Sequence, residues 1–462
     1  MSMVTPSAAS AEVGRADLLR VIGASVVVAI PVSLGAMGFL ALVTAVQTWV
    51  WETAPANLGF PTPPWWWAIP WLVLGGALAA AAISTFPGRG GHIPAHGTGG
   101  GPTPPSYVPG VSLAALAGLP FGAVLGPEAP LIAMGMGVAL WISRVVRLSP
   151  GGRIEALIGT AGSAAAISII LGNPLTAVIF MAEAVALIGG PVIAATIAAL
   201  LGVGVGAILF TGLGDLAGVQ AQSLQIVVLD SVPTPDVGDL LWAVPFGVVA
   251  AVTMTFIFTA GLRVEARLHP MRRTGLIAAT MVIGLIVALC ASCYSLLTGR
   301  SPFDVASSGT ETLAALSGNA SSWNSGALIA LIAFKGVAYT LSLGAFRGGA
   351  IFPSIMLGGA VGALLAPLPG LGLAGGLAVG MAAFASAGMR MPLSSVALTI
   401  LLFGSNAAEV FPEVAIAAVT AFTVRLAIEK RQKAQSMDTS ATASTADGSS
   451  SRLPGAPTTR PA

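Results

Sequence analysis

A single glutamate within an apolar stretch has the clearest chemical potential in this chain. Glu128 lies in the pattern Gly126-Pro127-Glu128-Ala129-Pro130, where glycine permits a turn and proline suits a first helical turn, so a helix is predicted to begin inside an apolar layer. The N–H groups and the positive dipole end at such a start form an anion site. An ionised carboxylate beside this site competes with the anion, whereas a protonated one clears the way or carries a proton. The alternative is a glutamate at an exposed helix start, which the dipole alone favours.

A second glycine- and proline-containing motif could face the same anion. It is GGAIFP at residues 348–353, and Gly349 within it permits a close approach of the backbone. We expect the N–H groups of Ala350, Ile351 and Phe352 to point at the anion. The predicted anion site therefore consists of backbone amides from two helix starts.

Two basic residues are candidates for the lining of an ion pathway. Arg347 precedes the second motif, and it either attracts anions at a pore entrance or anchors the chain at the membrane surface. Lys335 lies deep in the apolar run ALIALIAFKGVAYTL. It either extends its ammonium group to the membrane surface or places a positive charge that draws anions inward.

Two histidines have a spacing that occurs among metal ligands. His92 and His96 are four residues apart, which on an unbroken helix would place both imidazoles on one face for a metal ion. Pro94 between them disfavours such a helix. We therefore expect loop packing, or a contact with protons or anions near a pore mouth. No metal site and no cofactor are predicted.

The composition predicts an all-α, polytopic membrane protein. Of 462 residues only 8% are charged and 55% are hydrophobic, whereas soluble domains have about 25% charged residues. Glycine (58 residues) and proline (32 residues) are spread through the apolar stretches, which indicates many broken and tilted helices. A nucleic-acid-binding protein is excluded. An intramembrane enzyme is disfavoured, because the chain has three histidines and neither G-x-S-x-G nor H-E-x-x-H.

The chain divides into four predicted parts. Residues 1–19 are a short N-terminal segment, 20–235 and 236–430 are two transmembrane halves, and 431–462 are a Ser/Thr/Ala/Pro-rich tail that is expected to be disordered. The acidic segment 211–240 has no Lys or Arg, so it is the candidate for an external loop between the halves. By the positive-inside rule, both termini and the basic clusters lie in the cytoplasm. These clusters are Arg144, Arg147 and Arg153; Arg263, Arg267, Arg272 and Arg273; and Arg425, Lys430, Arg431 and Lys433.

An internal repeat supports the division into halves. Residues 122–140 and 162–180 of the first half match residues 344–364 and 380–400 of the second half in order. In each half a glycine-rich turn with proline opens an apolar helix, and about 40 residues later a small-residue helix meets Pro-Leu-Thr/Ser. We therefore expect two structurally related halves that meet near residue 235.

Four motifs together resemble those of the CLC chloride channels and proton/chloride antiporters, over about residues 20–430. The resemblance implies a homodimer in which each subunit holds its own pore between two antiparallel halves. It also implies that Glu128 is the external gating glutamate. The wording of the RGGAIFP motif is similar to that of a divergent bacterial branch of the family. The motifs are GPEAP at 126–130, NPLTAVIFMAE at 173–183, FRGGAIFP at 346–353 and RMPLSSVAL at 390–398.

Three positions depart from the family's pattern. Gly91, in the run GGHIP, stands where the family has a serine whose hydroxyl contacts chloride. Ala407 or Ala408 stands where the resemblance places a pore-lining tyrosine. Ala184 follows Glu183 at the place where many antiporters of the family have a second glutamate, which relays protons.

The resemblance and its departures favour an uncoupled CLC-type chloride channel that is gated by the protonation of Glu128. The alternatives are a proton-coupled chloride antiporter and a secondary transporter of another fold. The implied partners are a small inorganic anion, with chloride as the default, protons, the lipid bilayer and a second copy of the chain. The predicted location is the cell membrane, which the chain crosses many times.

Overall fold

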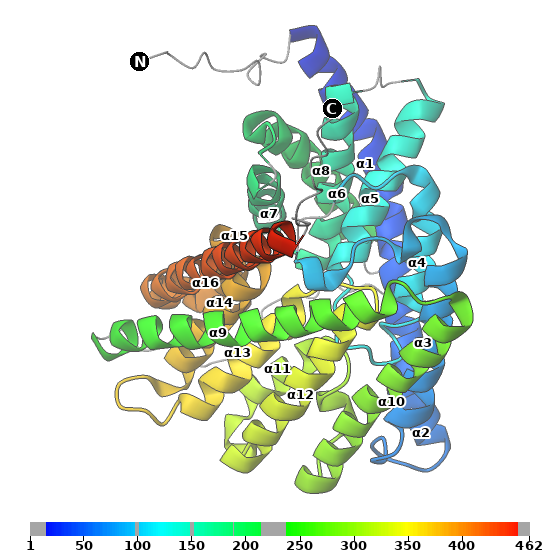
Figure 1. Ribbon diagram of the computed structural model, residues 1–462. Helices are drawn as coiled ribbons and strands as arrows, with labels where there is room; N and C mark the ends of the chain where they lie inside the picture. The colour runs from blue at the N-terminus through cyan, green and yellow to red at the C-terminus, as the bar shows by residue number, and fades with distance from the viewer. Residues whose placement is uncertain (1–14, 98–100, 148–151, 188, 214–236, 451–462) are drawn as a thin grey trace, which may run out of the picture.

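The protein is built from helices over the part of the chain that the computed structural model describes, which comprises residues 15–97, 101–147, 152–187, 189–213 and 237–450 (Figure 1). The predicted all-α class is confirmed for these residues. The α-helices are α1 (Arg15–Thr48), α2 (Ala54–Asn57), α3 (Ala68–Thr85), α4 (Val108–Leu116), α5 (Glu128–Val145), α6 (Gly152–Leu171), α7 (Pro174–Leu187), α8 (Val192–Leu213), α9 (Val237–Leu268), α10 (Arg273–Thr298), α11 (Thr310–Gly318), α12 (Ser325–Ala345), α13 (Ile351–Leu365), α14 (Gly372–Met389), α15 (Pro392–Phe403) and α16 (Ala407–Ser450).

Ten helical stretches among the described residues are long and apolar enough to cross a membrane. Several of them are interrupted, as the proline content predicts. α1, α9 and α16 each contain a proline, at Pro31, Pro245 and Pro412, and each proline removes one backbone hydrogen bond and allows the helix to bend. α1 also passes into a π-helical turn at Trp49–Thr53. The result is a polytopic membrane protein with irregular helices.

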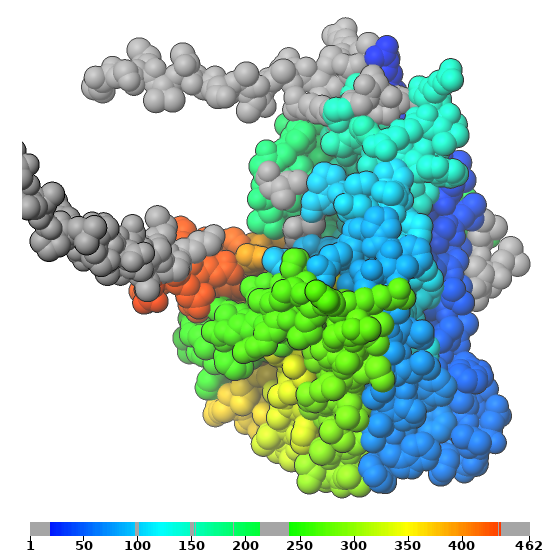
Figure 2. Space-filling view, turned by 45° about the vertical axis from the view of Figure 1, so that its right-hand side comes forward, coloured from blue at the N-terminus to red at the C-terminus, as the bar shows by residue number. Residues whose placement is uncertain are grey.

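The helices form two adjoining blocks that follow the chain order (Figures 1 and 2). α1 packs on α5, α6 and α8 of the first half, and α9 packs on α12, α14 and α16 of the second half. The halves meet where α3 contacts α10 and where α7 contacts α15. The predicted boundary near residue 235 and most of the predicted external loop 211–240 lie outside the described residues, so these two assignments stay predictions.

Glycine contacts between neighbouring helices repeat in the two halves. A Cβ added to Gly135 of α5 would lie 2.5 Å from the carbonyl oxygen of Gly162 in α6. Gly362 of α13 faces Gly376 of α14 in the same way. A side chain at any of these positions would push the helices apart, because their backbones are in contact. The paired packing of α5 with α6 and of α13 with α14 agrees with the repeat seen in the sequence.

The C-terminal tail differs from the expectation of disorder. α16 continues as a helix to Ser450, so residues 431–450 are helical in the structure, and residues 451–462 lie outside the described part. Lys, Ala, Gln and Met between residues 433 and 437 are good helix formers, which accounts for the continuation past the membrane-spanning part. At the other end, α1 begins at Arg15, within the predicted N-terminal segment.

Candidate functional site

The two predicted helix starts meet in the interior of the protein. α5 begins at Glu128 and α13 begins at Ile351, as the glycine and proline patterns predict. An antiparallel bridge joins the segments before them. The N–H of Gly126 donates to the carbonyl of Gly349 at 2.8 Å, and the N–H of Gly349 donates to the carbonyl of Gly126 at 2.5 Å. These bonds hold a helix start of the first half beside a helix start of the second half.

The carboxylate of Glu128 occupies the N-terminus of α13. Its Oε1 accepts the N–H of Phe352 at 3.1 Å, and the residue is 1% exposed. Among the described residues, Oε2 is buried without a hydrogen-bond partner. Glycine at positions 126 and 349 makes room for the group, since a Cβ on Gly349 would overlap the carboxylate. The alternative of an exposed glutamate is therefore wrong, and the carboxylate lies where the backbone amides would receive an anion.

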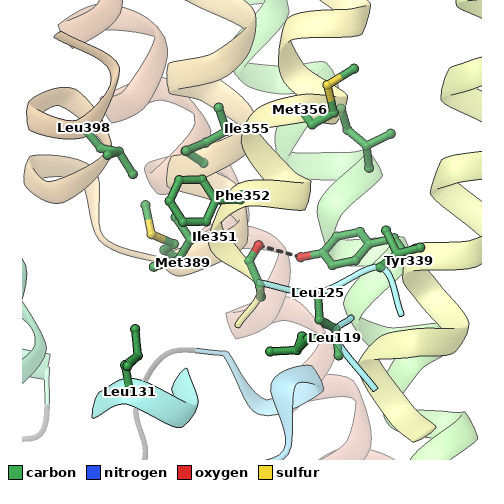
Figure 3. Close-up of a cluster of buried hydrophobic side chains, with 14 of the residues drawn as sticks. Leu119, Leu125, Leu131, Tyr339, Ile351, Phe352, Ile355, Met356, Met389 and Leu398 are labelled. Atoms are coloured by element: carbon green, nitrogen blue, oxygen red, sulfur yellow. Dashed lines mark hydrogen bonds between the residues drawn. The ribbon is translucent and has the colours of Figure 1, made fainter. Parts of the chain in front are cut away.

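Tyr339 and Ser354 fix the backbone at the start of α13. The hydroxyl of Tyr339 donates to the carbonyl of Ala350 at 2.8 Å, and Ser354 donates to the same oxygen at 2.7 Å. Figure 3 shows Tyr339 approaching α13 from the side opposite Met389 and Leu398. The sequence analysis missed Tyr339. The available signal was a tyrosine in an apolar helix, because a buried hydroxyl needs a partner.

A cavity of about 270 Å³ lies beside the first turn of α5 and brings three positions of the sequence analysis together. Gly91, Ala129 and Ala184 are among its lining residues. Gly91 has a left-handed φ of 86°, and a Cβ there would lie 2.6 Å from a methyl group of Val111. A side chain at position 91 would be strained by this φ and would require Val111 to shift, so glycine suits this position in the structure. The structure thus clusters the predicted residues Gly126, Pro127, Glu128, Ala129, Gly349, Ala350, Ile351 and Phe352, with Gly91 nearby.

Lys335 has a structural position that neither prediction anticipated. Its side chain is 0% exposed, and its ammonium group donates to four consecutive carbonyl oxygens, at 3.0–3.3 Å. These carbonyls belong to residues 304–307, which follow α10. The ammonium group neither reaches the membrane surface nor is available to a passing anion, because its donors are engaged. The prediction of a pore-lining Lys335 is therefore corrected.

Replacing Lys335 by methionine should lower stability strongly. The substitution keeps the volume but leaves four buried carbonyl groups without their donor, and we expect a loss of about 3–5 kcal/mol. The thermal unfolding midpoint in detergent measures it. Lys430→Met on the exposed surface of α16 is the matched control, with little expected change. Equal midpoints for the two variants would contradict the role assigned to Lys335.

Arg347 is buried and directly precedes the second motif in the sequence. Its side chain is 6% exposed; Nε donates to the carbonyl of Arg89 at 3.2 Å, and Nη1 donates to the carbonyl of Phe346 at 3.0 Å. It is therefore no anchor at the membrane surface. It lines a cavity of about 420 Å³ together with Arg89 and Glu265, and its place in an ion pathway stays a prediction.

Ala407 and Ala408 do not join the site. They lie at the start of α16, which follows the C-terminal end of α15. The N-terminal end of α15 is the one that contacts Glu183 of α7. Twelve residues of helix separate the two ends of α15, about 18 Å. Ala408 is exposed, and neither alanine lines the cavity that holds Gly91. The assignment of these two alanines to the lining of the inner pore stays a prediction.

The two histidines pack in a loop. The ring Nε2 of His92 contacts the carbonyl oxygen of Gly97, and the carbonyl of His96 accepts a hydrogen bond from Arg390 at 2.8 Å. Burial lowers the pKa of His92, so its imidazole is neutral at neutral pH. Among the described residues, no group of three His, Cys, Asp or Glu side chains could hold a metal ion.

Glu183 repeats the geometry of Glu128 at another helix start. Its carboxylate accepts the N–H of Leu393 at 3.0 Å, the N–H of Ser394 at 2.7 Å and the hydroxyl of Ser394 at 2.6 Å. These donors lie in the first turn of α15. In both cases a first-half carboxylate binds the N-terminus of a second-half helix, and at Glu183 three donors hold it.

The family assignment follows from the match of the sequence. The voltage gated chloride channel family matches residues 75–426, well over half of the chain. The chain belongs to this CLC family. The resemblance seen in the four motifs is thereby confirmed, and the alternative of a transporter of another fold is wrong. Family membership also agrees with the expectation of a multi-pass membrane protein that is not an enzyme.

Solved CLC structures share the fold. A slow cyanobacterial Cl⁻/H⁺ antiporter superposes with a TM-score of 0.72 at 19% identity, over 88% of this chain and 95% of that one. A CLC-type fluoride/proton antiporter gives a TM-score of 0.68 at 18% identity, over 90% and 97% of the two chains. At these identities the likeness concerns the fold alone.

Curated relatives match a shorter stretch. The "Putative ion-transport protein YfeO" of Escherichia fergusonii is 31% identical over 161 residues, and its counterpart in Salmonella choleraesuis is 30% identical over the same length. Each match covers 34% of this chain and 38% of the relative. The chain therefore spans less than two fifths of the length of the curated relatives in these matches.

Proposed function

We propose that this CLC-family protein moves small inorganic anions across the cell membrane, with chloride as the default, through a pathway closed by Glu128. The observation that carries the proposal is the carboxylate of Glu128 at the N-terminus of α13, where it accepts the N–H of Phe352. A carboxylate that binds backbone amides in the interior marks a place suited to another monovalent anion. The bound carboxylate closes the pathway when it is ionised and leaves it when it is protonated.

Anion flux from proteoliposomes tests this function. Vesicles that contain the purified protein should release chloride faster than empty vesicles, and replacement by bromide, nitrate or fluoride should rank the anions. If none of these four ions moves faster than through empty vesicles, the proposal fails.

The same series at two pH values should show faster flux at the lower pH, because protonation removes the competing charge of Glu128.

We favour an uncoupled channel over proton-coupled exchange. Ala184 offers no acid beside the cavity that it lines, and Glu183 is held by three donors of α15. A carboxylate whose oxygens are engaged by three donors is held in one place, which does not suit a mobile carrier of protons. A chloride gradient should therefore drive little proton movement, as measured with a pH-sensitive dye inside vesicles. Uphill proton pumping at a fixed stoichiometry would establish the antiporter alternative. The proposal also includes a homodimer, by family analogy, and cytoplasmic termini, by the positive-inside rule.

A further inference from the structure

An arginine-lined cavity lies apart from the glutamate site, where α9, the end of α14 and α16 come together. Its volume is about 410 Å³, and its lining includes Arg390, Arg425, Glu429 and Thr259. None of these residues contacts the carboxylate of Glu128. Arg425 lies in a helical stretch that is apolar enough to cross a membrane, where a buried charge is costly, so its place at this cavity needs an explanation.

Arg425 brings a buried positive charge to this cavity. Its side chain is 4% exposed, and its guanidinium lies over the ring of Phe258 at 4.7 Å from the ring centre. Nε donates to Glu429 at 3.0 Å and Nη1 donates to the carbonyl of Gly388 at 3.3 Å. A guanidinium group has five N–H donors, so these two bonds within the described part of the chain leave donors for a ligand.

Glu429 lies between the two arginines. Its Oε2 is 3.4 Å from Nη1 of Arg390, whose Nη2 donates to the carbonyl of His96 at 2.8 Å. One carboxylate between two guanidinium groups leaves a net positive charge in the cluster. Arg263 adds a further positive charge, because it lines an adjoining cavity that shares three lining residues with the first. The cluster is therefore arranged to attract a negatively charged solute.

Two aromatic side chains connect this cavity to the glutamate site. Phe258, which stacks under Arg425, contacts Tyr339 edge to face, with ring centres 6.3 Å apart. The hydroxyl of Tyr339 donates to the carbonyl of Ala350 at the start of α13 (Figure 3). An anion held at Arg425 would therefore lie one aromatic layer away from the amides that hold Glu128.

We infer that Arg390 and Arg425 form a binding site for a small monovalent anion, which binds there before or after it passes Glu128. This inference rests on the proposed anion transport. A positive cluster in a cavity with low-dielectric walls concentrates anions. Glu429 offsets one of the two positive charges, so the anion is held weakly enough to leave again, as conduction requires. The site uses side-chain charges, in contrast to the backbone amides at Glu128.

Chloride binding to the purified full-length protein in detergent, measured by calorimetry, tests the site. Arg425→Gln and Arg390→Gln should each raise the dissociation constant about tenfold, equal to about 1.4 kcal/mol. Glu429→Gln should lower it, because the competing carboxylate is gone. Arg300→Gln is the matched control, since Arg300 also stacks on an aromatic ring and pairs with an acid, at Trp323 and Asp304, and it should leave binding unchanged.

The outcomes separate this site from the proposed function. Weaker binding in both arginine variants with tighter binding in Glu429→Gln supports the site, even if vesicles show no flux and the transport proposal fails. Equal chloride affinities in all four variants and the unchanged protein overturn the site, even if flux is normal. If Arg425→Gln does not fold, the opposite shifts expected of Arg390→Gln and Glu429→Gln decide the question.

Discussion

Replacing Glu128 by glutamine should make anion flux independent of pH and about tenfold faster at neutral pH. The amide has nearly the same shape, but a neutral acceptor binds the N–H of Phe352 about half as strongly as a carboxylate does. An anion then displaces the side chain more readily at every pH. In the unchanged protein, flux should rise as the pH falls, since protonation produces a similar neutral side chain.

Chloride efflux at two pH values measures this effect in proteoliposomes. Glu155→Gln is a suitable control, because Glu155 is an ionisable residue of α6 that pairs with Arg144 on the surface, away from the helix starts. Its variant should keep the pH profile of the unchanged protein. An unchanged profile in Glu128→Gln would count against the gating role, even if chloride flux itself were observed.

The helix starts could be predicted because they depend on local rules. Glycine before a turn and proline in a first helical turn placed the beginnings of helices at Glu128 and Ile351, where the structure has them. The same pattern recurs in both halves, so the meeting of the two motifs was also predictable. Family membership then follows from the order of the motifs along the chain.

The partners of the buried polar groups could not be predicted, because they come from distant parts of the chain. Lys335 looked like an isolated charge, yet four carbonyls from a loop about thirty residues away surround it. Glycine at position 91 looked like a missing anion ligand, whereas the structure shows a left-handed backbone there and a close approach of Val111. In the sequence, Arg425 is one member of a basic cluster near the C-terminus. Sequence shows the charge of such a residue, whereas packing decides what it faces.

Gly349→Ala should disturb the site directly, because the added methyl group overlaps the carboxylate of Glu128. Overpacking of this kind costs about 1–3 kcal/mol. The methyl group also occupies the space that an anion would take, so we expect at least a tenfold loss of chloride flux. Gly336→Ala in α12 is the matched control. An added Cβ there meets nothing within 4 Å, and alanine is the better helix former.

The overlap can be isolated by combining Gly349→Ala with Glu128→Ala. If the carboxylate lies against Gly349, Gly349→Ala should lower the thermal unfolding midpoint when Glu128 is present. The same substitution should have a much smaller effect in the Glu128→Ala background, where the carboxylate is absent. The difference is an interaction free energy of about 0.5–3 kcal/mol, as expected for residues in contact. An equal loss of stability in both backgrounds would mean that the carboxylate lies elsewhere in solution. In that case the N-terminus of α13 would not be the place where glutamate and anion compete.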